Sequence, residues 1–349
     1  MSETDMTLKA GNAAWPVNQW YVAAYSHEVS RKPLHRWLLG KPVVLYRTES
    51  GEPVALFDRC PHRGLRLSAG SLVGNEIQCT YHGLRFGTDG RCTAIPSGGP
   101  ISPRMRIDSY PAVESWRFIW IWTGDAALAD PSLVPDVGVF GFGAKGWHDE
   151  PSGLLPLKAN WLLPFENLLD ASHISFLHHG LIDSGNVALL PFVMQENGAS
   201  LRVTRTIENE QMSPLTAKTF GFRGDRLNRS IIADAVVPSL CGIRVEVTSP
   251  DDPTSVPRIN QLIVGITPET LTTTYEFTAV AQSFPFENPN REEDVRNLLM
   301  EDVVAMEDIQ QLFARLGAEK STELSVQSDA AVMRMRRIVA GLLEQEKSP

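Results

Sequence analysis

The sequence predicts an α+β protein of two domains, a small all-β domain followed by a larger domain of helices and strands. Three observations predict this class. The chain has 349 residues, which is too long for one small module. From residue 19 to about residue 122, short β-prone runs are separated by Gly, Pro, Asn and Asp. Beyond residue 158, segments of helical periodicity occur beside longer β-prone runs. We therefore expect a flexible N-terminus at residues 1–15, a first domain at 16–125 and a second at 126–349.

The first domain contains two predicted hairpins. The runs 43–46 and 54–57 flank a turn-rich segment, and residues 86–92 contain an Asp-Gly pair that favours a tight turn. Residues 125–135 are then typical of a linker with a short helix.

The second domain begins with helical spacing over residues 158–180. Longer β-prone runs follow at residues 201–207, 230–237 and 271–277. The spacing of apolar residues predicts an amphipathic helix at 295–316 and another at 324–343.

The composition excludes several classes of function. Hydrophobic residues make up 43% of the chain and charged residues 21%, as in an ordinary globular protein. A net charge of -9 argues against nucleic acid as a partner, because phosphate binding needs a basic surface. No apolar run approaches the roughly 18 residues of a membrane span, and no secretory signal is visible. Four cysteines do not make a disulfide framework, so we expect a reducing, cytoplasmic location and no membrane partner.

Four residues in the first domain form a metal-ligand pattern: Cys60, His62, Cys79 and His82. Each half contributes one thiolate and one imidazole, C-x-H and then C-x-x-H. Such a set can hold a [2Fe–2S] cluster with one iron bound by both cysteines and the other by both histidines. The alternative is a structural zinc site, but zinc knuckles usually place two cysteines together. Tyr81 adjoins a histidine ligand and could donate its hydroxyl to sulfur, whereas Cys92 and Cys241 are expected to be ordinary buried residues.

A second constellation lies in the helical segment that opens the second domain. Asp170 and His173 are three residues apart and share a helical face. His178 follows five residues later, so both histidines can bind one metal only if the helix ends or distorts between them. Two histidines and one carboxylate make the facial triad of non-haem Fe(II). The late helix offers the acids Glu293, Asp294, Glu301, Asp302, Glu307 and Asp308, and spacing alone does not choose among them. The alternative is a polar patch without metal.

Arginines form two further groups. Those near the ligand pattern suggest a docking surface for an acidic redox partner, or else simply solvated side chains: Arg59, Arg63, Arg66, Arg85 and Arg91. Others lie in the β-prone part of the second domain: Arg202, Arg205, Arg223, Arg226, Arg229 and Arg244. One of these could anchor an aromatic carboxylate, although most strand arginines face solvent.

The order of these motifs resembles the Rieske non-haem iron oxygenases over nearly the whole chain. Within them it is similar to the terminal oxygenases of the vanillate and dicamba O-demethylase type. The segments that carry the resemblance are Asn18-Gln-Trp-Tyr-Val-Ala23, Cys60-Pro-His-Arg-Gly64, Cys79-Thr-Tyr-His-Gly83, Phe118-Ile-Trp-Ile-Trp122, Asn167-Leu-Leu-Asp170 with His173 and His178, and Glu301-Asp302 with Glu307 and Gln310-Gln311.

This resemblance implies a fold and a set of roles. The N-terminal domain would be an all-β Rieske [2Fe–2S] domain, and the C-terminal domain a helix-grip (START-like) catalytic domain with an antiparallel sheet. Asp302 would be the third iron ligand, and Asn167 would lie close to the iron. Asp170 would bridge His173 to His82 of a neighbouring subunit in a head-to-tail ring, commonly a homotrimer. His179 has no counterpart among the ligands, and Glu166 departs from the Asp that near relatives often carry, so its role is open.

The resemblance also implies an activity. A separate flavin and iron–sulfur reductase, with or without a ferredoxin, would deliver electrons from NAD(P)H, and the iron would use O₂ to oxidise a small aromatic substrate. We expect O-demethylation of a methoxylated aromatic acid, with release of formaldehyde. One alternative is a ring-hydroxylating dioxygenase or hydroxylase of the same fold. The other is a Rieske electron carrier whose second half is a binding domain.

Overall fold

The chain divides into two compact units in a computed structural model. The model describes residues 14–182, 187–221, 224–252, 254, 256–286, 288–317 and 323–347. The first unit comprises Val17–Val134 with Thr267–Thr270. The second comprises Pro135–Ile266 and Leu271–Pro349, together with the segment up to Pro16. Most of the flexible N-terminus expected at residues 1–15 lies outside the described residues.

The first unit is built from three small antiparallel sheets. The first sheet has the order β1-β11-β10, with β1 Trp20–Tyr25, β10 Ala112–Ser115 and β11 Phe118–Trp122. The second has the order β2-β3-β4-β9, with β2 Leu34–Leu38, β3 Lys41–Arg47, β4 Pro53–Phe57 and β9 Ser109–Tyr110. The third has the order β5-β6-β7-β8, with β5 Ser71–Val73, β6 Glu76–Gln78, β7 Arg85–Phe86 and β8 Cys92–Ala94. Short 3₁₀ turns lie between them: η1 Ser26–Glu28, η2 Leu67–Ala69, η3 Ala126–Leu128 and η4 Pro131–Leu133.

Both hairpins predicted from the sequence are confirmed. Strands β3 and β4 pair with Val43 opposite Phe57, and β7 and β8 pair with Phe86 opposite Cys92. The predicted linker helix is corrected to two separate 3₁₀ turns. Asp125 and Asp130 explain the break, because each carboxylate accepts a hydrogen bond from the backbone two residues on and so starts its own short turn.

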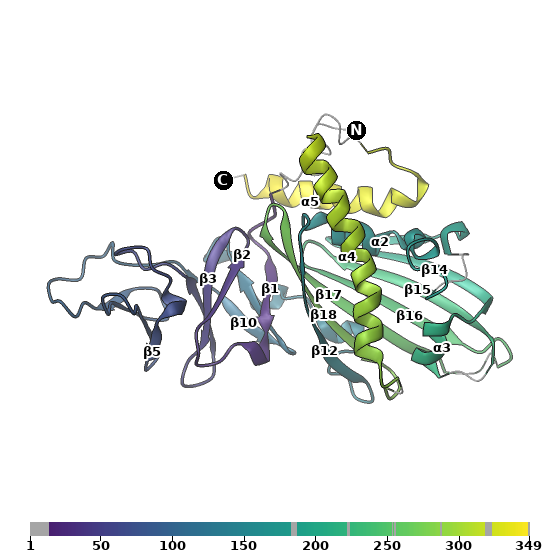
Figure 1. Ribbon diagram of the computed structural model, residues 1–349, viewed down its shortest axis with the longest axis horizontal. Coiled ribbons are helices and arrows are strands. Elements are labelled where there is room, and N and C mark those ends of the chain that lie inside the picture. The colour runs from purple at the N-terminus through teal and green to yellow at the C-terminus, as the bar shows by residue number, and fades with distance from the viewer. Residues whose placement is uncertain are drawn as a thin grey trace. The chain divides into compact units, whose positions relative to one another are not determined.

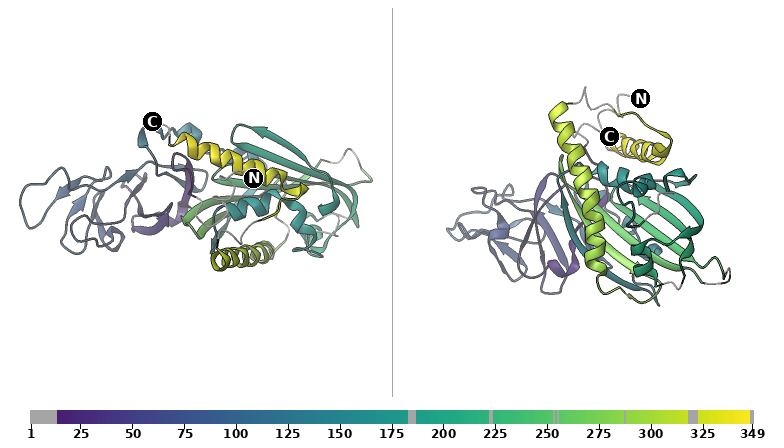
Figure 2. Two further views of the ribbon diagram at one scale, coloured as in Figure 1. Left: turned by 90° about the horizontal axis from the view of Figure 1, so that it is seen from above. Right: turned by 45° about the vertical axis from the view of Figure 1, so that its right-hand side comes forward.

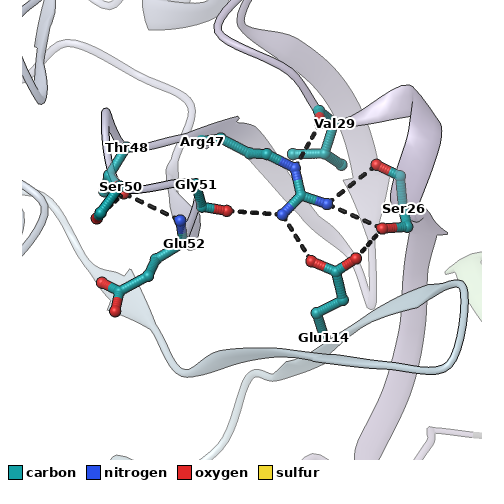
Figure 3. A network of polar contacts seen from close by, with 8 residues as sticks. All are labelled: Ser26, Val29, Arg47, Thr48, Ser50, Gly51, Glu52 and Glu114. Atoms are coloured by element: carbon teal, nitrogen blue, oxygen red, sulfur yellow. Dashed lines mark hydrogen bonds and ion pairs between the residues drawn. The ribbon is translucent and has the colours of Figure 1, made fainter.

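Arg47 ties several loops of the first unit together (Figure 3). Its Nε donates to the carbonyl of Val29 at 2.9 Å, and one terminal nitrogen donates to the carbonyl of Gly51 at 2.7 Å. The same nitrogen forms an ion pair with Glu114 at 2.6 Å. The other donates to the Ser26 hydroxyl at 2.9 Å, and that hydroxyl also contacts Glu114. A guanidinium group has five N–H donors, so this one side chain on β3 can hold residues 26–29, the turn at Gly51 and strand β10 together.

The second unit is a seven-stranded antiparallel sheet with helices (Figure 1). The strand order is β12-β18-β17-β16-β15-β14-β13. The strands are β12 His148–Leu157, β13 Val193–Asn197, β14 Ser200–Gln211, β15 Arg226–Val236, β16 Leu240–Thr248, β17 Arg258–Thr270 and β18 Thr273–Gln282. The helices are α2 Leu162–Leu169, α3 Pro214–Phe220, α4 Arg291–Leu316 and α5 Ala330–Gln345, with 3₁₀ turns η5 Val137–Phe140, η6 Ala171–Ser175, η7 Val187–Leu189 and η9 Gln327–Asp329.

Alternation along the strands places one apolar face of this sheet against the helices. Trp161, Phe165 and Leu169 around α2 and Val332, Met335 and Val339 of α5 pack on inward-facing residues of β14 to β17. Helix α4 lies across the same unit and packs Val303 and Met306 on Leu157 and Leu163 (Figures 1 and 2). The long helix predicted at 295–316 is thus confirmed, starting slightly earlier.

The last helix begins later than predicted, at Ala330 rather than residue 324. The Asp329 carboxylate accepts from the backbone N–H of Val326 at 2.7 Å, which holds residues 326–329 in a turn before the helix starts. In the part of the chain that the structure describes, we find no helix long and apolar enough to cross a membrane.

Candidate functional site: a two-histidine, one-carboxylate centre and a Cys/His loop pair

His173, His178 and Asp302 come together in the second unit. Helix α2 ends at its C-cap Asp170, and the chain continues as the 3₁₀ turn η6. The α-helix thus ends before His173, earlier than the predicted break between the two histidines, and it is the 3₁₀ turn that ends between them, at Ser175. One ligand atom from each of the three side chains lies within 4.8 Å of the others. Nε2 of His178 is 3.1 Å from Oδ1 of Asp302, and Nε2 of His173 is 3.6 Å from the same oxygen.

The second nitrogen of each imidazole is already occupied. Nδ1 of His173 lies 2.6 Å from the backbone carbonyl of Asp170, and Nδ1 of His178 lies 2.6 Å from Oε2 of Glu301. Such partners fix the tautomer and leave Nε2 as the lone-pair donor. Two Nε2 atoms and one carboxylate oxygen facing a common point suit a divalent transition metal, so the residues fit the expected iron.

Burial and nearby acids act on the two histidines in opposite directions. Burial lowers the pKa of His173, which favours the neutral imidazole that a metal requires. Burial also lowers the pKa of His178, but the hydrogen bonds and charges of Asp302 and Glu301 outweigh it and raise the net value. In the protein without metal, this raised pKa favours a protonated His178, whose positive charge balances the acid pair in place of a metal cation.

Asn167 and Asp170 contact this centre in different ways. Nδ2 of Asn167 donates to Oδ1 of Asp302 at 2.9 Å, in line with the expectation that it lies close to the metal. Within one chain, the expected bond between the Asp170 carboxylate and His173 is not what the structure shows. The carboxylate accepts from the Ser172 backbone at 3.0 Å and from the Ser328 hydroxyl at 3.0 Å, so His173 meets the Asp170 carbonyl instead.

Other residues singled out from the sequence take structural positions. Glu166 is bonded to the buried guanidinium of Arg336, whose side chain is 2% exposed. His179 is exposed, and Cys92 and Cys241 are buried.

The cluster-ligand candidates occupy two loops of the first unit with the same hydrogen-bond pattern. The N–H of Cys60 donates to the carbonyl of Leu65, and the N–H of Cys79 donates to that of Leu84, both at 2.8 Å. In each loop a glycine N–H returns to the cysteine carbonyl at 2.9 Å, from Gly64 and from Gly83. The two glycines have φ values of +81° and +71°, a conformation that a side chain would strain.

The four candidate side chains divide by burial. Cys60 and Cys79 are each 2% exposed and belong to the core of this unit, whereas His62 and His82 are exposed. The two imidazole rings are 4.4 Å apart between centroids. Burial raises the pKa of Cys60, and the neighbouring Cys79 adds to the effect. Two adjacent buried thiolates are favourable only beside a cation, so this donor set would also fit an iron–sulfur cluster.

An apolar cavity starts at the metal-ligand candidates. Its first part, of about 80 Å³, is bordered by His173, His178, Asp302 and Arg205. A second part, of about 140 Å³, extends along α4 to Asn260, Asn288 and Arg291. The two parts share the aliphatic residues Ile174, Ile182, Ile231, Ile243, Leu262, Leu298 and Leu299.

The arginines considered as substrate anchors are distributed unevenly. Arg205 and Arg229 border this cavity. Arg202 pairs with Asp234 at 2.6 Å and lines a different cavity of about 320 Å³ between η5 and β13–β15. Arg226 and Arg244 bond to Asn209 and Glu246. Arg223 lies outside the described residues.

Comparison with known proteins identifies the family. Residues 157–345 match the model of the vanillate O-demethylase oxygenase C-terminal domain, and residues 19–111 match the Rieske [2Fe-2S] domain. This chain is a Rieske oxygenase of the vanillate O-demethylase type. It is 34% identical to the toluene-4-sulfonate monooxygenase iron–sulfur subunit TsaM1 of Comamonas testosteroni, over 78% of this chain and 80% of that protein. It is 30% identical to the dicamba O-demethylase oxygenase component of Stenotrophomonas maltophilia, over 94% of this chain and 98% of that protein.

Solved structures agree with this assignment. The crystal structure of dicamba monooxygenase bound to dicamba superimposes with a TM-score of 0.87 at 29% identity, covering 97% of this chain and all of that one. The same enzyme has also been solved with non-heme iron and dicamba. The Rieske oxygenase described here is therefore an oxidoreductase, the terminal oxygenase component of a multicomponent monooxygenase system. It carries a Rieske cluster and a mononuclear iron and receives its electrons from a separate reductase.

Two contributors to the site were not singled out from the sequence. Glu301 appeared among the acids of the late helix and in the Glu301-Asp302 segment, without a role of its own. Its carboxylate contacts the same histidine as Asp302. Arg336 is the second, and nothing in the neighbouring sequence shows that it is buried against Glu166. The two residues are 170 positions apart, so only the folded chain shows that they pair.

Proposed function

We propose that this Rieske oxygenase removes the methyl group of a methoxylated aromatic compound, giving a phenol and formaldehyde. The proposal rests on one observation: His173, His178 and Asp302 border a narrow cavity that is otherwise lined mainly by aliphatic side chains. A cavity of this kind takes an apolar ring and holds one of its substituents at the metal. Relatives named as O-demethylases include those that act on dicamba and vanillate.

The residues proposed to hold the mononuclear iron are His173, His178 and Asp302, with Asn167 positioning the Asp302 carboxylate. The iron, when bound, supplies oxygen activation and C–H oxidation that no side chain can provide. The protein holds the imidazoles through Asp170 and Glu301, orients the aromatic ring and keeps water out of the aliphatic cavity. The sequence-based prediction specified an aromatic acid as substrate, which requires a group in the cavity that binds a carboxylate.

The residues proposed to hold the [2Fe–2S] cluster are Cys60, His62, Cys79 and His82, in a domain spanning residues 16–125. Residues 126–349 would form the catalytic domain. Substitution of His82 by cysteine should change the electron paramagnetic resonance of the reduced cluster towards that of an all-cysteine cluster and lower its reduction potential.

We also propose that copies of this chain assemble head to tail as a homotrimer, with His82 of one copy meeting Asp170 of the next. Support comes from charge. A cavity of about 290 Å³ beside α5 is bordered by the acids Glu166, Asp170, Glu323 and Asp329, with Arg336 as its basic residue. The cluster loops carry Arg59, Arg63 and Arg66, which are exposed and have no ion-pair partner among the described residues. The exposed basic loops of one copy would therefore be complementary in charge to the acidic cavity of another copy.

Arg63 and Asp329 provide the test of assembly. Light scattering should give the mass of a trimer, and Arg63→Glu should shift it towards the monomer at low salt. Arg63→Glu combined with Asp329→Lys should restore the trimer. A stable trimer in the single variant that loses only reductase-coupled turnover would instead assign the arginines to docking of the redox partner.

A substrate panel tests the reaction itself. The loaded enzyme with a surrogate reductase would be given methoxybenzoates, related aromatic acids, neutral methoxyarenes and N-methyl compounds, with oxygen uptake and formaldehyde measured together. Formaldehyde in step with oxygen uptake is the expected result. A ring-hydroxylated product or cis-diol without formaldehyde would favour the ring-hydroxylating alternative. N-dealkylation is a second candidate, because a relative from Rhizorhabdus wittichii, 31% identical over 80% of each chain, is named a chloroacetanilide N-alkylformylase.

A further inference from the structure

The walls of the cavity beside the iron-ligand candidates indicate the charge of the molecule that binds there. We propose that the cavity takes an uncharged, single-ring aromatic substrate whose hydrogen-bonding substituent meets the side-chain amide of Asn260. The inference rests on the proposed function, because it names the substrate class of that same site.

The size of the cavity limits the substrate to one ring. Its two parts have volumes of about 80 and 140 Å³ and share their aliphatic walls. An aliphatic cavity of roughly 150 Å³ in another protein binds benzene. A benzene ring with small substituents at opposite ends therefore fills the available space, with one end at His173, His178 and Asp302.

The arginines on the cavity wall already have acidic partners. Arg229 forms an ion pair with Glu210 at 2.6 Å, and both side chains are 4% exposed. Arg205 lies 3.7 Å from the Asp170 carboxylate and donates to the carbonyl of Leu190 at 2.6 Å. Each positive charge is thus compensated before a substrate enters.

The charged side chains at the far end of the cavity are paired as well. Arg291 contacts Glu150 and lies 3.6 Å above the ring of Phe286. Asp294, at the same end, accepts from Asn288 at 2.8 Å and lies 3.7 Å from Nζ of Lys218, so its charge is paired as well. A carboxylate brought into these walls would lose its hydration without gaining an uncompensated cation, and that loss is costly in an apolar cavity.

Asn260 supplies a neutral recognition group. It lies on β17 and borders the far part of the cavity. Its Oδ1 accepts from Nε2 of Gln282 at 2.8 Å, and Gln282 is 2% exposed, so the amide is held in place. Among the described residues nothing accepts from Nδ2 of Asn260. A fixed amide with a spare donor recognises a carbonyl, carboxamide, hydroxyl or ether oxygen and needs no charge.

Pairs of ligands that differ only in carrying a carboxamide or a carboxylate test this inference directly. Ortho-, meta- and para-methoxybenzamide would be compared with the corresponding methoxybenzoates at pH 7.5, because the members of each pair are similar in size and differ in charge. Equilibrium binding to the loaded enzyme would be measured by calorimetry. We expect at least one benzamide to bind ten times more tightly than its benzoate. Equal or tighter binding of the benzoate, or no binding of any benzamide, would overturn the inference.

Substitutions of Asn260 and Glu210 test which residues cause the preference for the uncharged ligand. Asn260→Ala should weaken binding of the benzamide about tenfold, the contribution of one hydrogen bond, and leave the benzoate unchanged. Gln195→Ala, an exposed amide on β13 outside the cavity, is the matched control and should bind like the parent. Glu210→Gln removes the acidic partner that lies 2.6 Å from Arg229 and should raise affinity for the benzoate about tenfold. Unchanged benzoate binding in that variant would contradict the charge argument.

Product analysis separates this inference from the proposed reaction. Preferred binding of the benzamide with a ring-hydroxylated product and no formaldehyde would leave the substrate class standing and refute demethylation. Faster formaldehyde release from the benzoates would leave demethylation standing and refute the substrate class.

Discussion

Glu301 and Asp302 are consecutive residues of α4 that contact the two nitrogens of one imidazole. Oε2 of Glu301 lies 2.6 Å from Nδ1 of His178, and Oδ1 of Asp302 lies 3.1 Å from Nε2. His178 is 2% exposed, so the contact with Glu301 sets the orientation of a ring that has little access to solvent. A carboxylate on the outer nitrogen also makes the inner nitrogen a stronger metal donor.

Glu301→Ala should therefore weaken metal binding by about 10- to 100-fold. The measurement is competition between the apoprotein and a chelator for Fe²⁺ or Co²⁺ under anaerobic conditions. Asp308→Ala, an exposed acid on the same helix, controls for loss of charge and should retain the parent affinity. Equal affinity in the Glu301 variant would show that the contact does not act on the metal.

Gly83→Ala should prevent the first unit from holding its cluster. Gly83 has a φ of +71°, and an added Cβ would lie 2.8 Å from Cγ of Pro96. Both effects displace the loop that carries Cys79 and His82. Iron, acid-labile sulfide and the visible spectrum of the purified protein measure the loss.

Gly74→Ala is the matched control for that loop. Its φ is +58°, so the backbone strain is comparable, but an added Cβ meets nothing within 4 Å. The control should keep its cluster with only a small decrease in stability. Cluster loss in both variants would mean that strain anywhere in this sheet is sufficient.

Glu166→Ala should destabilise the second unit by about 3 kcal/mol, because it leaves the buried guanidinium of Arg336 with reduced compensation. Glu323, 3.4 Å from Arg336, keeps the expected loss at the lower end of the range for a broken buried pair. Glu196→Ala removes the partner of Arg334 on the same helix and should cost much less, because that pair is solvent-exposed and screened. Urea unfolding of both variants measures the difference, and similar losses would refute the importance of burial.

Glu114 gives a prediction for pH. The hydrogen bond from Arg47 holds the pKa of this carboxyl below its ordinary value, with a smaller contribution from Ser26. A folded pKa below the unfolded one means that the unfolded chain binds the proton more readily. The stabilisation is therefore fully present above the unfolded value of about 4.3 and is lost as pH falls through the lower folded value.

Glu114→Gln should accordingly destabilise the first unit at pH 7 by less than about 1 kcal/mol, since the pair is partly exposed. The difference from the parent should shrink as pH falls below about 4. Thermal unfolding at both pH values provides the comparison. A difference independent of pH would show that packing of Glu114, rather than its charge, stabilises the fold.

Local patterns predicted much of this protein. Two short β-prone runs around a turn-rich segment located the β3–β4 hairpin, and helical periodicity located α4, because both signals depend on neighbours within a few positions. An interruption of helical geometry ahead of His178 also followed from spacing, since five residues do not return to one helical face. The α-helix itself ends earlier, before His173. The start of α5 and the division of residues 126–133 into two turns differed from the prediction. Backbone N–H groups that donate to single Asp side chains hold these turns.

The sequence by itself determined the ligand types and their spacing in the Cys/His loops and the Asp/His segment, since these are properties of adjacent residues. Resemblance to a known family then supplied the expected role of Asp302. Only the tertiary structure decided that Glu301 orients His178, that Arg336 is buried against Glu166, and that the arginines on the cavity wall are already paired. The first two contacts join residues more than a hundred positions apart. The ion pair of Arg229 with Glu210 joins neighbouring strands, and the fold of the sheet and helices brings all of these residues together.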